Sequence, residues 1–508
     1  MEPTPAHVLA DRARLTPDAP AYVDSSGRTF AFRDADRRAR TLASRLATEG
    51  VKPRDRVVVL AKNDEFLATT FFALSYLGAV AVIANWRLPV PELAYVVENS
   101  EPVALLHDSE FADTVSALVY ATNRADLIRV VSGAAPAGDS ASVVDAHETL
   151  EQPMGPTLTP VGTSTDPAVI MYTSGTTGRP KGAVLTNANL FWSAQSMTTT
   201  ISWEPHHRFL LVSPMFHIAG LAPLTASVLR GNATIFMRDF DPVEVWRTIA
   251  AQRITTMMAV PLMLQAMLQA ARANDVDSSS LLNISCGGSM VPLTLIDGFE
   301  ELGVNIQVVY GMTEFTGSLT YRLPEMGAKS RASQGKALFG AELKIVDPAT
   351  GTDAAASVPG EVWCRGPQRF AGYWRNDAAT SEAVTVDGWY RSGDIGFLDA
   401  DGFLHLVDRV KDMLISGGEN IYPAELETVI AQHPDVIEVA VVGAPDERWG
   451  EVPVAHVVRA EGSSLTEEDV VALCRENLAG FKRPKKVVFI DRLPRNAIGK
   501  IQKAVLRA

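Results

Sequence analysis

The stretch YTSGTTGRPKG, at 172–182, has the residue types of a phosphate-binding loop. Backbone N–H groups and the hydroxyls of serine and threonine can surround phosphate oxygens, and Lys181 adds a positive charge. It is not the common G-x-x-x-x-G-K-[ST] loop, because Pro180 stands where the second glycine belongs and Gly182 replaces the hydroxyl residue that holds magnesium. A flexible linker is a poor alternative, because Pro180 stiffens the segment and an apolar strand precedes it. The stretch therefore predicts contact with phosphate.

Two other short stretches end in a carboxylate. YGMTE, 310–314, follows an apolar segment, so we expect Glu314 at the C-terminal edge of a strand, where open α/β sheets bind ligands. A hard carboxylate at that edge suits magnesium. YRSGD, 390–394, places Asp394 in a turn, where it can accept hydrogen bonds from ribose hydroxyls. Taken singly, the two residues are also explained as an ordinary surface Glu and an ordinary turn Asp.

Two C-terminal stretches carry glycines and lysines. DRVKDMLISGGENIYP, 408–423, contains Gly417 and Gly418, and paired glycines allow the backbone to approach a ligand closely. PRNAIGK, 494–500, places Lys500 on a turn that contains a glycine. By itself Lys500 is one lysine among several in a basic tail.

The elements that position these stretches alternate between strand and helix. RVVVL at 56–60 predicts a strand, 65–77 a buried helix and 79–83 a second strand, and the alternation continues to about 310. This pattern predicts an α/β fold with stacked, mostly parallel sheets. The uncharged run 66–84 is long enough to cross a bilayer. Gly78 divides it into a helix and a strand, so we interpret it as the core of a soluble βαβ unit.

The pattern changes twice after residue 330. Short strands and dense turns over 331–410 predict a β-rich subdomain. Residues 411–508 predict a small α+β domain. We therefore expect a large N-terminal domain, 1–410, that includes the β-rich part, and a C-terminal domain, 411–508.

Composition limits the class of protein. With 508 residues, 47% hydrophobic and 21% charged, the chain is expected to be soluble and to have more than one domain. The net charge of −13 argues against a nucleic-acid partner. Its three cysteines form no C-x-x-C pair, which favours reduced thiols and a cytoplasmic location. The N-terminus lacks a basic region followed by an apolar one, so no secretory signal is expected.

In order and spacing, all these stretches resemble those of adenylate-forming (AMP-binding) enzymes of the acyl-CoA synthetase type, relatives of luciferases and of peptide-synthetase adenylation domains. The resemblance covers essentially the whole chain and is greatest to bacterial fatty-acyl-CoA synthetases. It implies that ATP and Mg²⁺ convert a carboxylic acid into an acyl-adenylate, and that the acyl group then passes to coenzyme A. It also implies that the C-terminal domain is mobile and swivels between the two steps.

The resemblance assigns residues to the adenylation step. The catalytic residues are expected to be Lys500, Glu314, Thr173 and Lys181. Glu314 is expected to bind Mg²⁺, Thr313 the α-phosphate, and Lys500 the carboxylate and adenylate oxygens. The triphosphate is expected on Thr173, Ser174, Gly175, Thr176, Thr177, Gly178 and Lys181; the adenine beside Gly287, Gly288, Ser289, Tyr310 and Gly311; and the ribose on Asp394 and Arg409.

It also assigns residues to the thioester step and to the acid pocket. Lys411 is expected at the hinge, with Gly417 and Gly418 along the pantetheine channel. The coenzyme A nucleotide is expected near Trp449, Phe481, Arg483 and Lys485, where the basic run FKRPKK suits its 3′-phosphate. The acid pocket is expected to be lined by His217 as its gate, Val260, Gly287, Val309, Gly311 and Gly317. Because Gly287 lacks a side chain, we expect the pocket floor to be open to a longer chain.

Several alternatives remain within this interpretation. A medium- or long-chain fatty acid is the leading substrate, and an aryl or arylalkanoic acid of the cinnamate or benzoate type is the alternative. The stretch PMFHIAG, 214–220, has no carboxylate, which argues against an amino-acid substrate. A carrier protein could replace free coenzyme A, although FKRPKK and Trp449 favour the coenzyme. An inactive regulator would need a changed Lys500 or Glu314, a luciferase-like oxygenase has no support, and a homodimer is left open.

Overall fold

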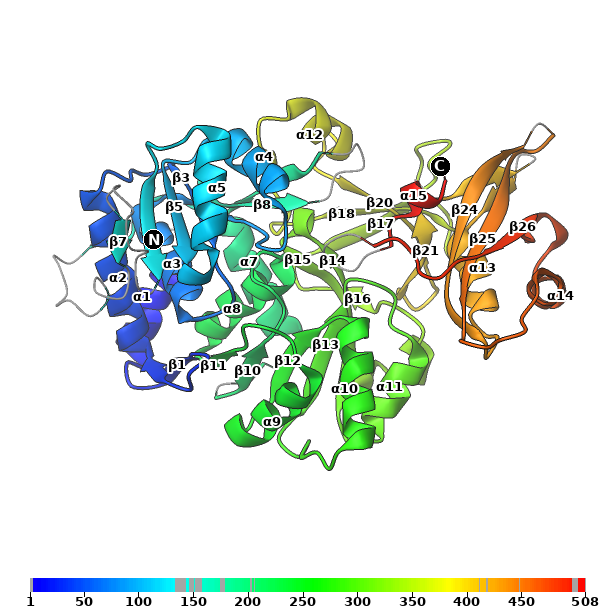
Figure 1. Ribbon diagram of the computed structural model, residues 1–508, viewed down its shortest axis with the longest axis horizontal. Coiled ribbons are helices and arrows are strands. Elements are labelled where there is room, and N and C mark those ends of the chain that lie inside the picture. Colours follow the sequence, from blue (N-terminus) through cyan, green and yellow to red (C-terminus); the bar gives the residue numbers. More distant parts are fainter. Residues whose placement is uncertain are drawn as a thin grey trace. The chain divides into compact units, whose positions relative to one another are not determined.

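The computed structural model describes residues 3–132, 143–145, 150, 158–173, 179–201, 203–204, 206–410, 412–416, 419–446, 448–495 and 501–507. Contacts divide the chain into two compact units, Met1–Glu342 with Arg365–Tyr390 and Leu343–Cys364 with Arg391–Ala508 (Figure 1). Most of the β-rich segment therefore groups with the C-terminal residues in this conformation. The predicted domain boundary at 410/411 is where the C-terminal domain is expected to swivel between the two reaction steps, and it stays a prediction.

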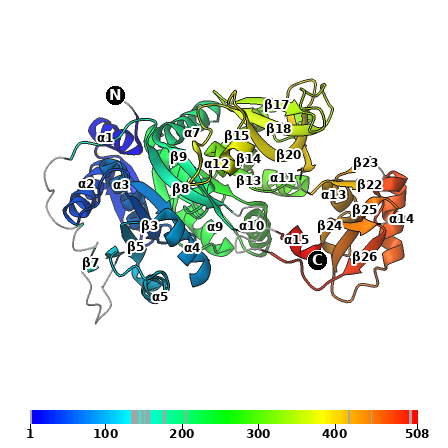
Figure 2. The same cartoon turned by 90° about the horizontal axis from the view of Figure 1, so that it is seen from above.

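The first unit contains two large sheets that are mostly parallel (Figure 2). Among the described residues, one has the order β16 (Lys336–Ala337), β15 (Gly317–Arg322), β14 (Asn305–Met312), β13 (Asn283–Gly287), β12 (Thr256–Ala259), β10 (Arg208–Leu211), β11 (Ala233–Phe236), β1 (Pro20–Val23), β2 (Thr29–Ala31). The other has the order β19 (Gly372–Tyr373), β9 (Lys181–Thr186), β8 (Pro167–Thr173), β4 (Val80–Ile83), β3 (Arg56–Leu60), β5 (Ala104–Asp108), β6 (Ile128–Ser132), β7 (Val143–Asp145). The predicted α/β class is confirmed.

Helices pack on these sheets. The described helices of this unit are α1 (Pro5–Leu15), α2 (Phe32–Thr48), α3 (Glu65–Leu77), α4 (Val90–Ser100), α5 (Ala112–Thr122), α7 (Asn187–Thr200), α8 (Ile218–Arg230), α9 (Pro242–Gln252), α10 (Pro261–Ala273), α11 (Leu293–Glu300) and α12 (Asp377–Ala383). Short 3₁₀ turns include η2 (Thr313–Phe315). One core cluster joins α9, α10 and α11 to a single face of β12, β13 and β14, which Figure 1 shows in green. Helix α8 lies against β12 and β15 of the same sheet.

The apolar run 66–84 forms the predicted βαβ unit. β3 and β4 pair in parallel, and α3 joins them. Gly78 ends the helix with φ of 64°, a left-handed conformation that glycine adopts without strain. Every residue of α3 is buried, which explains why Glu65 is the one charged residue in this helix. No helix in the described part of the chain is long and apolar enough to cross a membrane.

A buried ion pair joins α2 to α3. Arg38 donates two hydrogen bonds to Glu65, of 2.7 and 3.0 Å, and the two side chains are 4% and 8% exposed. Thr69 donates to the same carboxylate, and the Arg38 guanidinium lies over the ring of Phe30 at 4.9 Å. The geometry satisfies both charges where water is excluded.

The second unit is built from two antiparallel-rich sheets. Among the described residues these are β17 (Glu342–Val346), β18 (Gly360–Arg365), β20 (Tyr390–Leu398), β21 (Leu404–Arg409); and β23 (Glu419–Ile421), β22 (Leu414–Ser416), β25 (Gly450–Arg459), β24 (Val436–Asp446), with β26 (Lys486–Phe489) beside β25. Helices α13 (Pro423–Ile430), α14 (Glu467–Asn477) and α15 (Lys503–Leu506) complete it. Lys503 pairs with Glu427 at 2.7 Å and so fastens α15 to α13.

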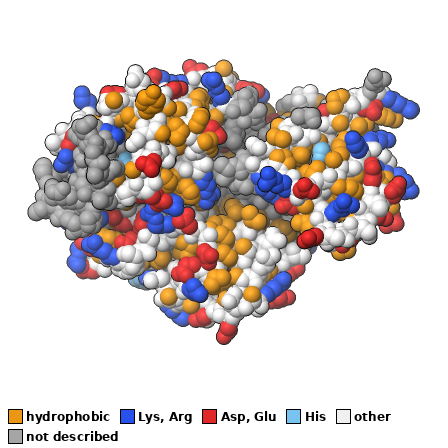
Figure 3. Space-filling view, in the orientation of Figure 1, with side chains coloured by type: hydrophobic (Ala, Val, Ile, Leu, Met, Phe, Trp, Pro, Cys, Tyr) orange, Lys and Arg blue, Asp and Glu red, His pale blue; other side chains and the backbone are white. Residues whose placement is uncertain are grey.

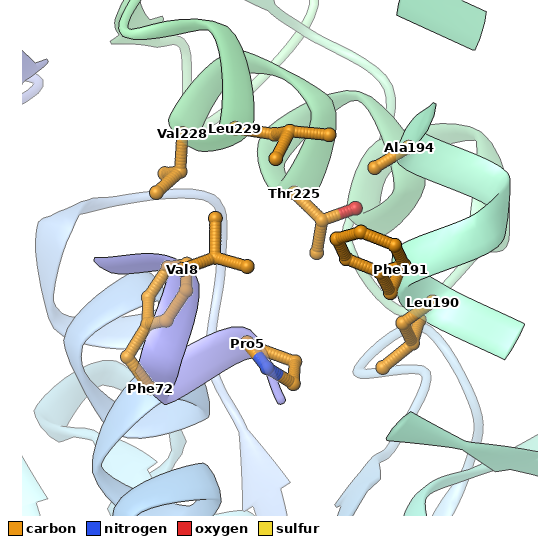
Figure 4. Close-up of a pocket in the computed structure, with 9 residues that line it drawn as sticks. All are labelled: Pro5, Val8, Phe72, Leu190, Phe191, Ala194, Thr225, Val228 and Leu229. Carbon is orange, nitrogen blue, oxygen red and sulfur yellow. The ribbon is translucent and has the colours of Figure 1, made fainter. Parts of the chain in front are cut away.

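A small cavity in the first unit is a packing gap. Side chains from α1, α3, α7 and α8 surround about 10 Å³ of space (Figure 4), which is room for about one water molecule. The lining is apolar apart from Thr225, whose hydroxyl donates to the Ala222 carbonyl. This cavity is too small to be a substrate site.

Surface and thiols agree with the composition. On the face drawn in Figure 3, acidic and basic side chains are interspersed and form no continuous basic surface. Cys286, Cys364 and Cys474 form no disulfide and are buried. Burial raises the pKa of the Cys474 thiol to about 11, which makes it unreactive near neutral pH.

Candidate active site

The predicted phosphate-binding stretch connects two paired strands. Thr173 ends β8 and Lys181 begins β9, and the two residues are directly opposite each other in an antiparallel pair. The residues between them that were expected on the triphosphate, Ser174 to Gly178, lie outside the described residues. A side chain on Gly182 would lie 2.7 Å from Ile170 and 3.4 Å from Trp374, so this position needs glycine for packing. The hydroxyl residue of a kinase-type loop has no room here.

Glu314 lies in the turn η2, directly after β14. Its carbonyl accepts a hydrogen bond from the Phe370 N–H at 2.9 Å. Two further bonds hold the end of the turn, because the Thr316 carbonyl accepts from Ser193 at 2.6 Å and the Thr316 hydroxyl donates to the Gln368 carbonyl at 2.7 Å. The backbone that carries Thr313 and Glu314 is therefore fixed from both sides.

Tyr373 connects Glu314 to Lys181. The Tyr373 hydroxyl donates to the Glu314 carboxylate at 2.9 Å, and the Lys181 ammonium lies 5.1 Å from the centre of the Tyr373 ring. Burial, together with the negative charge of Glu314, raises the pKa of Tyr373, so its hydroxyl stays protonated and keeps donating. The sequence reasoning missed this residue. The tyrosine in FAGYW, 370–374, gives no local sign of its partner, which is 59 positions away.

The donors at this edge fit a magnesium ion that carries phosphates and water. No group of three or more His, Cys, Asp or Glu side chains gathers anywhere in the described ranges, so these residues form no all-protein cage. Mg²⁺ is usually held by one or two carboxylates and by substrate phosphates. Glu314, oriented by Tyr373 beside Lys181, provides such a carboxylate.

The expected adenine-binding residues lie at the same edge of the sheet. Gly287 and Val309 are opposite each other in the parallel pair β13–β14, and Gly288 follows with φ of +83°. Gly288 and Ser289 are exposed, whereas Tyr310 is 8% exposed. A side chain on Gly311 would lie 1.9 Å from the Gly317 carbonyl, so β14 and β15 meet too closely there for any other residue.

The structure corrects one expectation about Gly287. A side chain there would lie 2.2 Å from the Val309 carbonyl and 2.6 Å from a Val309 methyl group. The glycine is therefore explained by the close approach of Val309, and it is no evidence of an open floor for a longer chain. Val309 is only partly buried, and a side chain on the exposed Gly288 would lie 3.5 Å from the exposed Val260.

The predicted gate residue, His217, caps the N-terminus of α8. Its imidazole packs against Phe216 at 4.6 Å, and its Nε2 atom is enclosed without a hydrogen bond. Asn63 fixes the segment that carries it: its side-chain amide donates to the Ser213 carbonyl at 3.0 Å, and its oxygen accepts from the Met215 N–H at 2.9 Å. Asn63 thus positions the gate segment across 150 positions of sequence.

Burial, reinforced by the charge of Arg87, lowers the pKa of His217 from 6.5 to about 4. Between these values the unfolded chain binds a proton that the folded chain does not. We therefore expect the free energy of unfolding to fall by up to about 3 kcal/mol as pH drops through this window. Urea unfolding at pH 7.5 and 4.5 should show a smaller loss for His217→Leu than for the unchanged protein. His207 and His456, whose pKa values burial also lowers, remain in both proteins. An equal loss in the two proteins would assign the pH dependence to other groups.

In the second unit, the two expected ribose-binding residues are brought together. Asp394 and Arg409 are opposite each other on β20 and β21, and the Arg409 Nε lies 3.0 Å from the carboxylate. Their side chains are 11% and 42% exposed, so the pair reaches the surface on the arginine side.

The structure does not bring the described residues expected near coenzyme A into contact as it does Asp394 and Arg409. Trp449 is 41% exposed, and the Arg448 guanidinium lies 4.8 Å from the centre of its ring. Lys485 is exposed, whereas the Arg483 side chain donates to the Leu478 carbonyl. Lys411, Gly417, Gly418 and Lys500 lie outside the described residues, as does the side chain of Phe481.

Comparison with known proteins decides the family. The family model "AMP-binding enzyme" matches residues 9–374, and "AMP-binding enzyme C-terminal domain" matches 425–500. The chain belongs to the AMP-binding enzyme family. Among its relatives, feruloyl-CoA synthase of an Amycolatopsis species is 39% identical over 98% of this chain and 97% of that protein. Long-chain-fatty-acid–CoA ligase FadD13 of Mycobacterium tuberculosis is 35% identical over 98% and 97%.

A solved structure agrees with this assignment. O-succinylbenzoate coenzyme A synthetase (MenE) from Bacillus subtilis, in complex with ATP and magnesium ion, is 31% identical with a TM-score of 0.86 and covers 99% of both chains. This AMP-binding enzyme is therefore an AMP-forming acyl-CoA synthetase, and the predicted class is confirmed. The expected ATP, Mg²⁺ and coenzyme A are those of the class.

Proposed function

We propose that this enzyme activates an aryl or arylalkanoic acid. It uses ATP and Mg²⁺ to form the acyl-adenylate and pyrophosphate, and then forms the thioester with coenzyme A and releases AMP. The observation that carries the choice of acid is Val309, which occupies the space beside Gly287 that was expected to admit a longer chain. Without that space, Gly287 gives no reason to prefer a long alkyl chain to a compact acid. The feruloyl-CoA synthase relative supports the same choice.

The first half-reaction needs help because a carboxylate is a poor acyl donor, and because the attack brings two anions together. Thr173 and Lys181, at the two ends of the phosphate-binding stretch, hold the β- and γ-phosphates as the leaving pyrophosphate. Glu314 holds the metal, whose charge offsets that of the phosphates. Thr313 donates to the α-phosphate, and Lys500 bridges the attacking carboxylate and the adenylate oxygens. Asp394 and Arg409 hold the ribose.

The second half-reaction needs the thiol in place of Lys500. Rotation at Lys411 removes Lys500 and brings Gly417 and Gly418 to the pantetheine channel. Trp449 and Lys485 are exposed and available to the coenzyme nucleotide, which supports free coenzyme A over a carrier protein. The three buried cysteines, which form no disulfide, support a cytoplasmic location. The homodimer stays a prediction.

A fatty acid is the second candidate. The gate segment has no carboxylate, and Val260 and Val309 are apolar, which suits an alkyl chain. The FadD13 relative supports this candidate too.

A panel of acids with ATP, Mg²⁺ and coenzyme A distinguishes the candidates. We expect cinnamate- or benzoate-type acids to give AMP and pyrophosphate with a higher kcat/KM than alkanoic acids of eight to sixteen carbons, each acid being omitted in turn as the control. A preference for the alkanoic acids would reject the aryl proposal. Formation of ADP would reject the adenylation mechanism itself.

A further inference from the structure

Two side chains of β18 are bonded to each other on one face of the strand. Val362 and Cys364 are both 0% exposed and point into the core. Because side chains alternate along a strand, Glu361 and Trp363 lie together on the opposite face. The Trp363 indole N–H donates to one oxygen of the Glu361 carboxylate at 2.8 Å.

The other oxygen of the Glu361 carboxylate reaches the stretch YRSGD, 390–394. It accepts a hydrogen bond from the Gly393 N–H at 3.1 Å. The Gly393 carbonyl in turn accepts from the Val410 N–H at 2.9 Å. Gly393 has φ of 70°, a left-handed conformation that glycine adopts without strain. This glycine is therefore bonded on both sides, and the residue after it is Asp394.

Trp363 contacts the same stretch at a second point. β18 lies between β17 and β20 in the sheet (Figure 1). The Lys344 ammonium of β17 and the Arg391 guanidinium of β20 lie over the Trp363 ring, 5.1 and 5.0 Å from its centre. Cations are attracted to the face of an aromatic ring. β18 therefore holds YRSGD both at Arg391 and at Gly393.

The bond from Glu361 to Gly393 is the feature that sheet pairing does not explain. An N–H in a sheet usually bonds to a backbone carbonyl, whereas here a charged side chain is the acceptor. Such charge-assisted bonds are about twice as strong as neutral ones. Glycine has the widest choice of backbone conformations, so a glycine directly before Asp394 would let that carboxylate turn away. The bond to Glu361 restricts this freedom.

We propose that Glu361 and Trp363 are positioning residues for nucleotide binding, because they fix the turn from which the Asp394 carboxylate meets the ribose hydroxyls of ATP. The inference rests on the ribose-binding role of Asp394 in the proposed function. It adds residues that act through Asp394 and do not touch the nucleotide. A displacement of about 1 Å in a binding group can cost about a hundredfold in rate.

The experiment compares ATP with 2′,3′-dideoxy-ATP, which lacks both ribose hydroxyls, in the full-length enzyme with the acid that it activates best. We expect the unchanged enzyme to prefer ATP at least about tenfold in kcat/KM, measured as pyrophosphate release, because bonds to a charged carboxylate are lost with the analogue. Asp394→Ala should remove this preference and so defines complete loss. Glu361→Ala should lower the preference at least about threefold, and Trp363→Phe should lower it less. Glu361→Gln keeps an oxygen for the Gly393 N–H and should keep most of the preference.

Glu342→Ala is the matched control. Glu342 is on β17, beside β18, and its carboxylate pairs with Arg365 at 2.7 Å. Its removal takes a charge from the same sheet without touching YRSGD, so the preference for ATP should not change.

The outcomes separate the positioning role from the proposed function. A Glu361→Ala enzyme that is slower with both nucleotides alike keeps the full preference, which overturns the positioning role and leaves Asp394 as the ribose ligand. An unchanged enzyme that uses both nucleotides equally well overturns the ribose role of Asp394, and the inference with it. The choice of acid does not enter the ratio, so a fatty acid in place of an aryl acid would leave this test intact.

Discussion

Glu314→Gln should lower the rate of acyl-adenylate formation by about 10²–10³-fold, the usual effect of removing a preorganised charged group from the reacting centre. Glutamine has nearly the same shape and can still accept the hydrogen bond from Tyr373. It lacks the negative charge, so it binds Mg²⁺ much more weakly. Pyrophosphate release with saturating acid and ATP measures this step. Thioester formation from synthetic acyl-adenylate, which needs no triphosphate, should be affected much less.

Two further variants make this experiment specific. Tyr373→Phe keeps the Glu314 charge and removes only the bond that orients it, so we expect a drop of about tenfold, equivalent to one hydrogen bond to a charged group. Glu301→Gln removes a charge from an exposed position at the end of α11 and should leave both half-reactions unchanged. Raising the Mg²⁺ concentration should recover part of the Glu314→Gln activity. Adenylation by Glu314→Gln within tenfold of the unchanged enzyme would exclude Glu314 as the metal ligand.

The parts of the fold that local pattern decides could be predicted from the sequence. The run 56–83 shows why: the apolar strands, the cap at Asp64 and the left-handed Gly78 are all local features, and β3, α3 and β4 form as expected. Glu314 could be placed for the same reason, because it follows an apolar strand directly. Its neighbours could not. Tyr373 and Ser193 reach the Glu314 turn from 59 and 123 positions away, and no periodicity links such residues.

The glycines show the same limit more sharply. Gly182 and Gly287 were interpreted through the ligand, as a missing hydroxyl and as an open pocket floor. In the structure both are set by a neighbouring strand or side chain, Ile170 and Trp374 in one case and Val309 in the other. A glycine can mean that space for a side chain is absent, or that space for a ligand is present. The neighbouring strand decides between these two explanations. The register of that strand is set by the whole sheet and cannot be seen in the local sequence.

The second large effect concerns stability. Arg38→Met and Glu65→Leu should each lower the free energy of unfolding by about 3–5 kcal/mol, because each leaves its partner charged and buried without compensation. The two side chains are 4% and 8% exposed, so water cannot take over the lost bonds. Urea unfolding followed by tryptophan fluorescence measures the loss.

The double variant Arg38→Met with Glu65→Leu tests the reason for that loss. It removes both charges and leaves apolar side chains of similar size, so it should be more stable than either single variant, with a coupling free energy of several kcal/mol. The exposed pair Arg14 and Asp11 on α1, at 67% and 51% exposure, is the matched control, and Arg14→Met should cost about 0–1 kcal/mol. Additive losses in the double variant would mean that helix packing, and not the ion pair, holds α2 against α3. Coupling would instead show that the ion pair itself holds α2 against α3. The turn before α3 carries Asn63, which positions the gate segment of the acid pocket, so this pair supports the element from which the gate is held.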